Sequence, residues 1–209
     1  ARHIPQFLYM AKEWAEENMA NIFDRQNYQK WLCAMQGYSF VNVIYDQVYN
    51  YLKASGDFHH ALADHNLKDQ TDRKIIENIV VAYLNDLENL EDPENLIDYL
   101  INNKFYTELH HLIWFIWSQH KDVNEKLPGK VLVLWERLMI LVNHDTPEGK
   151  ALGSKLCDWL VFIEKVDDLN RAMIHSVVAC TNEDKFSFGL LDNIARISER
   201  QPEEAFKIW

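Results

Sequence analysis

The chain has 209 residues and a formal net charge of −11, with 32 acidic and 21 basic residues. Hydrophobic residues make up 48% of it and charged residues 25%, a composition that excludes wholesale disorder and permits a sizeable core. Only 6 glycines and 5 prolines interrupt the chain, too few for a β-sandwich or barrel of this length, so we predict an all-α fold of long helices with short connections.

The acidic surface and the apolar runs exclude two classes of partner. An excess of carboxylates repels phosphate backbones, and no run of basic residues offsets it locally, so no nucleic-acid partner is predicted. The most apolar run, Val131 to Val142, contains Glu136 and Arg137. It is shorter than the ~20 residues of a membrane span, which predicts a buried helix and no membrane partner.

The cysteines point to a reducing compartment. They are odd in number, lie far apart and form no CxxC pair: Cys33, Cys157 and Cys180. Neither a disulfide framework nor a zinc site is indicated, and each cysteine sits among apolar residues as a small hydrophobe. We expect a cytoplasmic protein without a cofactor.

Three helices are predicted in the first part of the chain. The first covers Pro5 to Phe23, with proline suited to the first helical turn. The second covers Asn27 to Gln36 and is closed by Gly37. Ser39 caps the third, which Gly56 ends. Apolar residues at steps of three and four place one face of this third helix in the core: Val41, Ile44, Val48 and Leu52.

A polar, histidine-rich segment, Asp57 to Lys68, is predicted to hold a short helix or loop. The clearest helical pattern of the chain follows, with polar residues on the opposite side of this apolar stripe: Ile76, Ile79, Val80, Tyr83, Leu84, Leu87 and Leu90. Asp92-Pro93-Glu94 then has the character of a helix start, namely an N-cap, a proline in the first turn and a carboxylate near the positive end of the dipole.

The later helices are apolar nearly all round, which is typical of central helices covered on several sides. They are predicted at Leu109 to Trp117, Val131 to Val142 and Leu156 to Ile163. The remaining helices are predicted at Leu169 to Cys180, at Phe186 to Arg200 and from Pro202 onward.

A Pro-Glu pair recurs at Pro93, Pro147 and Pro202, 54 and then 55 residues apart. This spacing suits a repeat of two helical hairpins, although Pro-Glu is also simply a good helix start used three times. Together with the scarce glycine, the pattern resembles helical repeat scaffolds of the HEAT or TPR kind. The resemblance implies an antiparallel helical array, a repeat or solenoid of helical hairpins, which binds proteins or peptides.

The expected organisation is an N-terminal helical segment, residues 1–70, followed by a helical repeat region, residues 71–209. The weakly patterned segment from Asp57 to Gln70 could be a hinge or a loop, so one continuous domain is an alternative. The helix that begins at Pro202 is still open at Trp209, and we therefore expect a fragment of a larger protein.

A cluster of possible metal ligands lies in the polar segment: His59, His60, Asp64 and His65. His60 and Asp64 share a face if the segment is helical, the spacing that metal sites use. Such a site needs further ligands and a fixed set of supporting hydrogen bonds. We favour the interpretation as a solvated histidine-rich loop.

A second set has the order His, His-Asp, Asp, and it consists of His110 or His111, then His144 and Asp145, then Asp192. This order resembles the HD phosphohydrolase family, an all-helical fold. The resemblance implies that these residues hold a divalent metal that polarises a phosphoryl oxygen and activates a water molecule.

The surroundings of the doublet depart from the HD pattern. Asn143 precedes it, and Thr146-Pro147 starts a new helix at once. In that family the doublet ends an apolar helix among small residues and is usually followed closely by glycine. Asp145 is then explained as a turn or capping residue, and we assign no metal ligand here.

No Walker A, GxGxxG or GxSxG motif is present, so we predict no catalytic residues. Exposed aromatic residues would be binding anchors, and the least obviously buried ones are Tyr38, Tyr49 and Trp209. The predicted function is a non-catalytic protein-interaction or sensor module. It is similar to helical regions of large bacterial multidomain proteins, including NTPase-type defence sensors. The alternatives are an HD-like phosphohydrolase and a structural spacer or oligomerisation domain.

Overall fold

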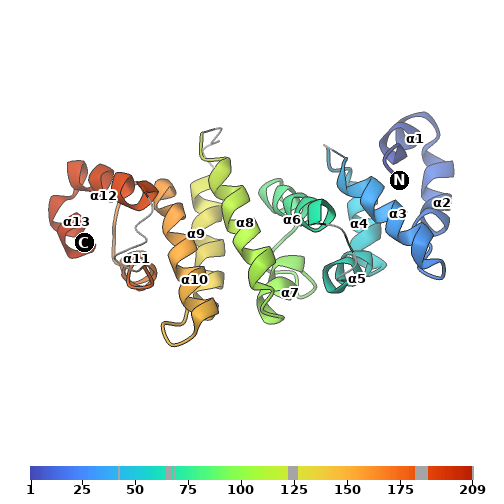
Figure 1. The fold of residues 1–209 in the computed structure, drawn as a ribbon. Helices are drawn as coiled ribbons and strands as arrows, with labels where there is room; N and C mark the ends of the chain where they lie inside the picture. The colour runs from blue at the N-terminus through green and yellow to red at the C-terminus, as the bar shows by residue number, and fades with distance from the viewer. Residues whose placement is uncertain (42, 65–66, 68, 122–126, 182–187, 209) are drawn as a thin grey trace. The chain divides into compact units, whose positions relative to one another are not determined.

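The structure is a computed structural model that describes residues 1–208 except 42, 65–66, 68, 122–126 and 182–187. Within these residues it contains thirteen α-helices, two 3-10 helices and no strand, which confirms the predicted all-α class (Figure 1). The chain forms two compact units, unit 1 at Ala1–Tyr99 and unit 2 at Leu100–Trp209. The predicted repeat and the predicted division at residue 70 stay predictions.

Unit 1 is built from seven helices, the last of which continues past its boundary. They are α1 (Ile4–Met10), α2 (Lys12–Ile22), α3 (Tyr28–Ser39), α4 (Asp46–Ala54), α5 (Asp57–Ala63), α6 (Asp69–Leu84) and α7 (Leu96–Asn102). Helix α3 packs against α2 and α6, and α5 packs against α4 and α6. Large side chains fill the space between these helices and are fully buried, among them Trp31, Met35, Tyr49, Leu52, Phe58 and Ile79.

The predicted helix from Pro5 to Phe23 is wrong as one element, because the chain breaks at Ala11. Ala11 leaves the helical region with φ −151° and ψ 64°. Its backbone N–H donates to the Phe7 carbonyl and so closes α1. The break brings the rings of Phe7 and Trp14 together at a centroid distance of 5.3 Å. Neither glycine nor proline marks this position, so the sequence carries no local signal for it.

The predicted boundaries around Gly37 and Ser39 are also wrong. Both residues lie inside α3, and the Ser39 hydroxyl donates to the Gln36 carbonyl instead of capping a new helix. Gly37 permits a close approach of the chain start, because a Cβ there would lie 3.2 Å from the Arg2 nitrogen. Helix α4 begins only at Asp46. Gly56 does end it as predicted, with φ 74° in the left-handed region.

The stripe from Ile76 to Leu90 is helical only as far as Leu84. Asp86 adopts φ 63°, and the Leu87 nitrogen donates to the Ala82 carbonyl, which closes α6 in a Schellman motif. Asp92-Pro93-Glu94 is a turn that precedes α7, not its first turn. Asn95 is the residue that caps α7, since its side-chain oxygen accepts from the Asp98 nitrogen at 2.7 Å.

Unit 2 contains six further α-helices and both 3-10 helices. They are α8 (Tyr106–Ser118), α9 (Leu127–Leu138), η1 (Met139–Leu141), α10 (Pro147–Leu156), η2 (Cys157–Phe162), α11 (Arg171–Val178), α12 (Phe188–Arg200) and α13 (Pro202–Ile208). Helix α8 packs against α10 and η2. At the centre Trp135 meets Trp159 edge-on at 6.2 Å, and the Trp159 indole donates to the Ile113 carbonyl at 3.0 Å.

Two helix starts in unit 2 agree with the sequence. Pro147 begins α10, where the Thr146 hydroxyl accepts from the Gly149 nitrogen, and Pro202 begins α13. The predicted α-helix from Leu156 to Ile163 is instead mostly the 3-10 helix η2. The Arg196 guanidinium donates hydrogen bonds to the backbone carbonyls of Leu160 and Ile163, at 2.7 and 3.0 Å. It thereby pairs carbonyls at the end of η2.

Two ion pairs that share Glu204, at the end of unit 2, lead to a pH prediction. Arg171 and Lys207 donate to the two oxygens of Glu204 at 2.8 and 2.9 Å, and these bonds lower the pKa of Glu204 to about 2. A carboxylate whose pKa falls on folding adds stability above its unfolded value near 4.5 and loses it as the pH drops through 2.

We therefore expect Glu204→Gln to lower the Tm at pH 6, and we expect its difference from the wild type to shrink between pH 4.5 and 2. Thermal unfolding followed by circular dichroism at several pH values measures this difference. The neighbouring Glu203→Gln is the control, because Glu203 is exposed. A Tm difference that stays constant down to pH 2 would contradict the assignment.

Candidate interaction surface

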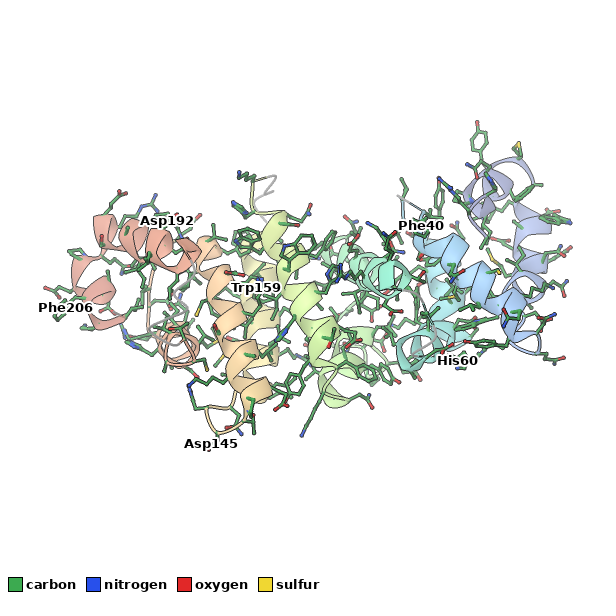
Figure 2. The ribbon with its side chains drawn as sticks, in the orientation of Figure 1. Phe40, His60, Asp145, Trp159, Asp192 and Phe206 are labelled. Carbon is green, nitrogen blue, oxygen red and sulfur yellow. The ribbon has the colours of Figure 1, made fainter. Side chains whose placement is uncertain are left out.

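The residues of the HD-like pattern do not come together in unit 2. His144 is exposed in the turn before α10. Its Nδ1 atom lies 3.4 Å from the Cys180 sulfur, and its Nε2 atom lies 3.4 Å from the Ser176 hydroxyl. The Asp145 nitrogen donates to the Asn143 side chain at 2.8 Å, so this doublet belongs to a turn. Figure 2 shows Asp145 in that turn and Asp192 well apart from it on α12.

The two histidines of α8 lie in other surroundings. The Nε2 atom of His110 is buried without a hydrogen-bond partner. The pKa of this side chain is lowered, mainly by burial and to a smaller extent by the positive charge of Lys155. His111 stacks on Trp114 at 5.3 Å. In the described part of the chain, no three His, Cys, Asp or Glu side chains are placed to hold a metal ion.

The histidine cluster of unit 1 packs against aromatic rings. His59 meets Tyr99 edge-on and His60 meets Trp31, each with ring centroids 4.5 Å apart. Asp64 follows the end of α5 in an extended conformation and accepts a 2.7 Å hydrogen bond from Tyr28. His60 and Asp64 therefore do not share a helical face, and His65 lies outside the described residues.

The predicted aromatic anchors are wrong for two of three residues. Tyr38 is only 3% exposed and Tyr49 is fully buried, where its hydroxyl donates to Glu88 at 2.7 Å. Trp209 lies outside the described residues. Other large side chains are exposed in unit 1, and the most exposed among them belong to α1, with Tyr9 at 92% and Met10 at 71%.

These exposed side chains border an open groove, which we call the N-terminal groove. It has a volume of about 490 Å³ and is lined by Pro5, Gln6, Leu8, Tyr9, Met10, Tyr45 and Gln47. One wall is helix α1, and the other is the start of α4 with the residue before it. Figure 2 labels Phe40, a further exposed aromatic residue, where α3 ends and the segment leading to α4 begins.

The described lining of the N-terminal groove carries no formal charge, although the chain as a whole carries −11. Its polar groups are the amides of Gln6 and Gln47 and the hydroxyls of Tyr9 and Tyr45. Each of these groups can donate and accept hydrogen bonds, as a peptide backbone requires. The groove therefore offers apolar contact with neutral hydrogen-bonding groups beside it.

A second cavity, which we call the inner pocket, lies next to the groove and shares Pro5 and Tyr45 with it. The inner pocket is a narrow crevice without room for a water molecule, and it is lined by Ala1, Ile4, Pro5, Tyr38, Val41, Val43, Tyr45 and Val48. The hydroxyl of Tyr38 is buried and has no hydrogen-bond partner. Burial raises the pKa of Tyr38, so this hydroxyl stays protonated.

Sequence reasoning missed both cavities for one reason. It assigned residues 5–10 to one long helix and residues 41–48 to the apolar face of another, whereas α1 is short and residues 41 and 43–45 are not helical. A weak signal was present in the run from Phe40 to Tyr45, where β-branched and aromatic residues depress helix propensity.

None of the helices that the structure describes combines the length and apolar character that a membrane span requires. Comparison of the chain with protein-family models, with curated proteins and with solved structures finds no match.

Proposed function

We propose that the chain is a non-catalytic protein-interaction module that binds an uncharged, apolar segment of a partner protein in the N-terminal groove. The observation that carries this proposal is the groove itself, with Tyr9 and Met10 exposed at its wall. Contiguous exposed apolar surface marks interaction sites, and tyrosine and methionine are enriched in them.

The lining determines the chemistry of the partner. A charged side chain would lose hydration in the groove without meeting an opposite charge among the described lining residues, which costs free energy. Apolar side chains gain by burial against Leu8, Met10 and the tyrosine rings. The amides of Gln6 and Gln47 can then bond to the backbone of the bound segment.

We further propose that this module works in the cytoplasm as part of a larger protein. All three cysteines are free, which suits a reducing compartment. The acidic surface outside the groove keeps such a module soluble and discourages nucleic-acid binding.

The experiment is a selection of random peptides displayed on phage against the wild-type protein. We expect enriched peptides to be apolar and uncharged. A double variant, Tyr9→Ser with Met10→Ser, should lower their affinity about 30-fold, as expected for the loss of an aromatic anchor. The matched control is Phe206→Ser, which removes an aromatic residue 82% exposed in unit 2 and should leave affinity unchanged.

Three results would overturn the proposal. The first is a selection that enriches no peptide above a control protein, and the second is a set of peptides that bind the double variant as tightly as the wild type. The third concerns the groove's occupant. If analytical ultracentrifugation showed a dimer that the double variant abolishes, a second copy of this chain would fill the groove instead.

A further inference from the structure

The polar side chains of the N-terminal groove are free to bind a partner. They are the amides of Gln6 and Gln47 and the hydroxyls of Tyr9 and Tyr45, and none of them forms a hydrogen bond with another described residue. The amides donate through their NH2 groups and the hydroxyls through their O–H. A segment that covers these groups has to pair them, because a polar group buried without a partner is costly.

Tyrosine rings accompany these donors on both walls of the groove. Tyr9 belongs to α1 and is 92% exposed, while Tyr45 lies directly before α4 and is half-buried. Pro5 and Leu8 add apolar surface to the wall formed by α1. Grooves lined by aromatic rings are the surfaces on which proline-rich segments dock.

We propose that the N-terminal groove binds a proline-rich segment of the partner in the polyproline II conformation. This inference rests on the proposed function, and it names the class of segment that the module recognises. A polyproline II segment has no internal hydrogen bonds, so its carbonyls are available to the amides of Gln6 and Gln47 and to the tyrosine hydroxyls. Its prolines have no N–H, so their burial against the tyrosine rings leaves no donor unpaired.

The open shape of the groove favours a segment that is ordered before it binds. Its two walls contact only part of the surface of a bound segment, which limits the apolar area that binding can bury. Ordering a flexible segment costs conformational entropy, and this limited contact has to offset that cost. The ring of proline fixes φ and leaves no side-chain freedom to lose, so a proline-rich segment loses less entropy than other segments.

Two other ways of binding a segment fit the groove less well. Strand addition needs the exposed edge of a sheet, but the described residues hold no strand, and helices α1 and α4 supply the walls. An amphipathic helix pairs its backbone groups internally. It would therefore cover the amides of Gln6 and Gln47 without offering them backbone partners.

The first test measures fluorescence anisotropy with a labelled peptide of about ten prolines, a probe that adopts polyproline II in water. We expect it to bind the wild type and to bind Tyr45→Leu about tenfold more weakly, because the ring is lost. Tyr45→Phe keeps the ring, so its affinity should stay within about threefold of the wild type. A peptide of the same length made of alanine and serine is the control and should not bind.

The second test needs only the wild-type protein. Adding the unlabelled proline peptide to 15N-labelled protein should shift the side-chain NH2 signals of Gln6 and Gln47 in the NMR spectrum. The NH2 signal of Gln201 in unit 2 is the internal control, because this side chain is already paired with the backbone of Val166. It should not move.

The phage selection completes the test, because groove-dependent peptides should be enriched in prolines three residues apart, one turn of polyproline II. Groove-dependent peptides without this enrichment would overturn the inference and leave the proposed function standing. The same holds if the proline peptide leaves the NH2 signals of Gln6 and Gln47 in place, or if it binds Tyr45→Leu as tightly as the wild type. If no groove-dependent peptide were selected, both proposals would fall.

Discussion

Replacing Glu88 by alanine is expected to lower the free energy of unfolding of unit 1 by about 3–5 kcal/mol. The Glu88 side chain is fully buried and accepts from three groups, namely the Lys53 ammonium at 3.0 Å, the Tyr49 hydroxyl at 2.7 Å and the Leu96 nitrogen at 2.7 Å. Its removal leaves the Tyr49 hydroxyl and the Leu96 nitrogen without an acceptor, leaves Lys53 with Asp92 alone and opens a cavity. Urea unfolding of the variant measures the loss.

The stability that Lys53 contributes to this network is expected to fall at high pH. Burial alone would lower the pKa of Lys53, but its hydrogen bonds to Asp92 and Glu88 outweigh that effect and raise the pKa. The contribution to stability is therefore present below the unfolded value of 10.5 and is lost as the pH rises through the folded value.

The control for Glu88→Ala is Glu16→Ala, which removes an acid from the exposed Lys12–Glu16 pair of α2. Exposed pairs of this kind contribute under about 1 kcal/mol, because water and salt screen them. If Glu88→Ala proved as mild as Glu16→Ala, Glu88 would have to be solvated, and its place at the centre of unit 1 would be wrong.

The second large effect is expected at Gly149, near the start of α10. A Cβ at this position would lie 2.7 Å from the Asn143 nitrogen and 2.8 Å from its carbonyl oxygen. Both atoms are backbone, so the clash cannot be relieved by a side-chain rotation. We expect Gly149→Ala to destabilise unit 2 by about 2–3 kcal/mol.

Gly129 supplies the matched control, because it is an exposed glycine in α9 and a Cβ added there would meet no atom of the described residues within 4 Å. Gly129→Ala should stabilise unit 2 by about 0.5–1 kcal/mol, since alanine favours the helix and restricts the unfolded chain. The two variants should thus shift the urea midpoint in opposite directions. A Gly149→Ala protein as stable as Gly129→Ala would contradict the close approach of Asn143 to α10.

The apolar pattern was sufficient to locate most helices of unit 2. Their stripes are long and their starts are marked by local chemistry, as Thr146 and Pro147 show at α10. Such signals act within one turn of helix, so the sequence carries them directly. The 3-10 helix η2 escaped prediction because its stabilising contact comes from Arg196, more than thirty residues away.

Unit 1 shows where local signals fail. Ala11 breaks a helix without any breaking residue, and Asp86 takes the left-handed position that glycine usually signals. Gly37 misled the prediction in the opposite way, because a glycine suggested a helix end where the helix continues. Gly37 lies inside α3 and permits the backbone of Arg2 to approach closely. The N-terminal groove depends on the first of these features, which only packing between distant segments determines.

The most direct test of the central claim is amide hydrogen exchange, followed by mass spectrometry, with and without a peptide selected against the wild type. Our account predicts slower exchange in residues 4–10 and 41–48, which hold the whole described lining of the groove, and unchanged exchange in unit 2. Protection confined to unit 2, or no protection of these two segments, would contradict binding in the N-terminal groove.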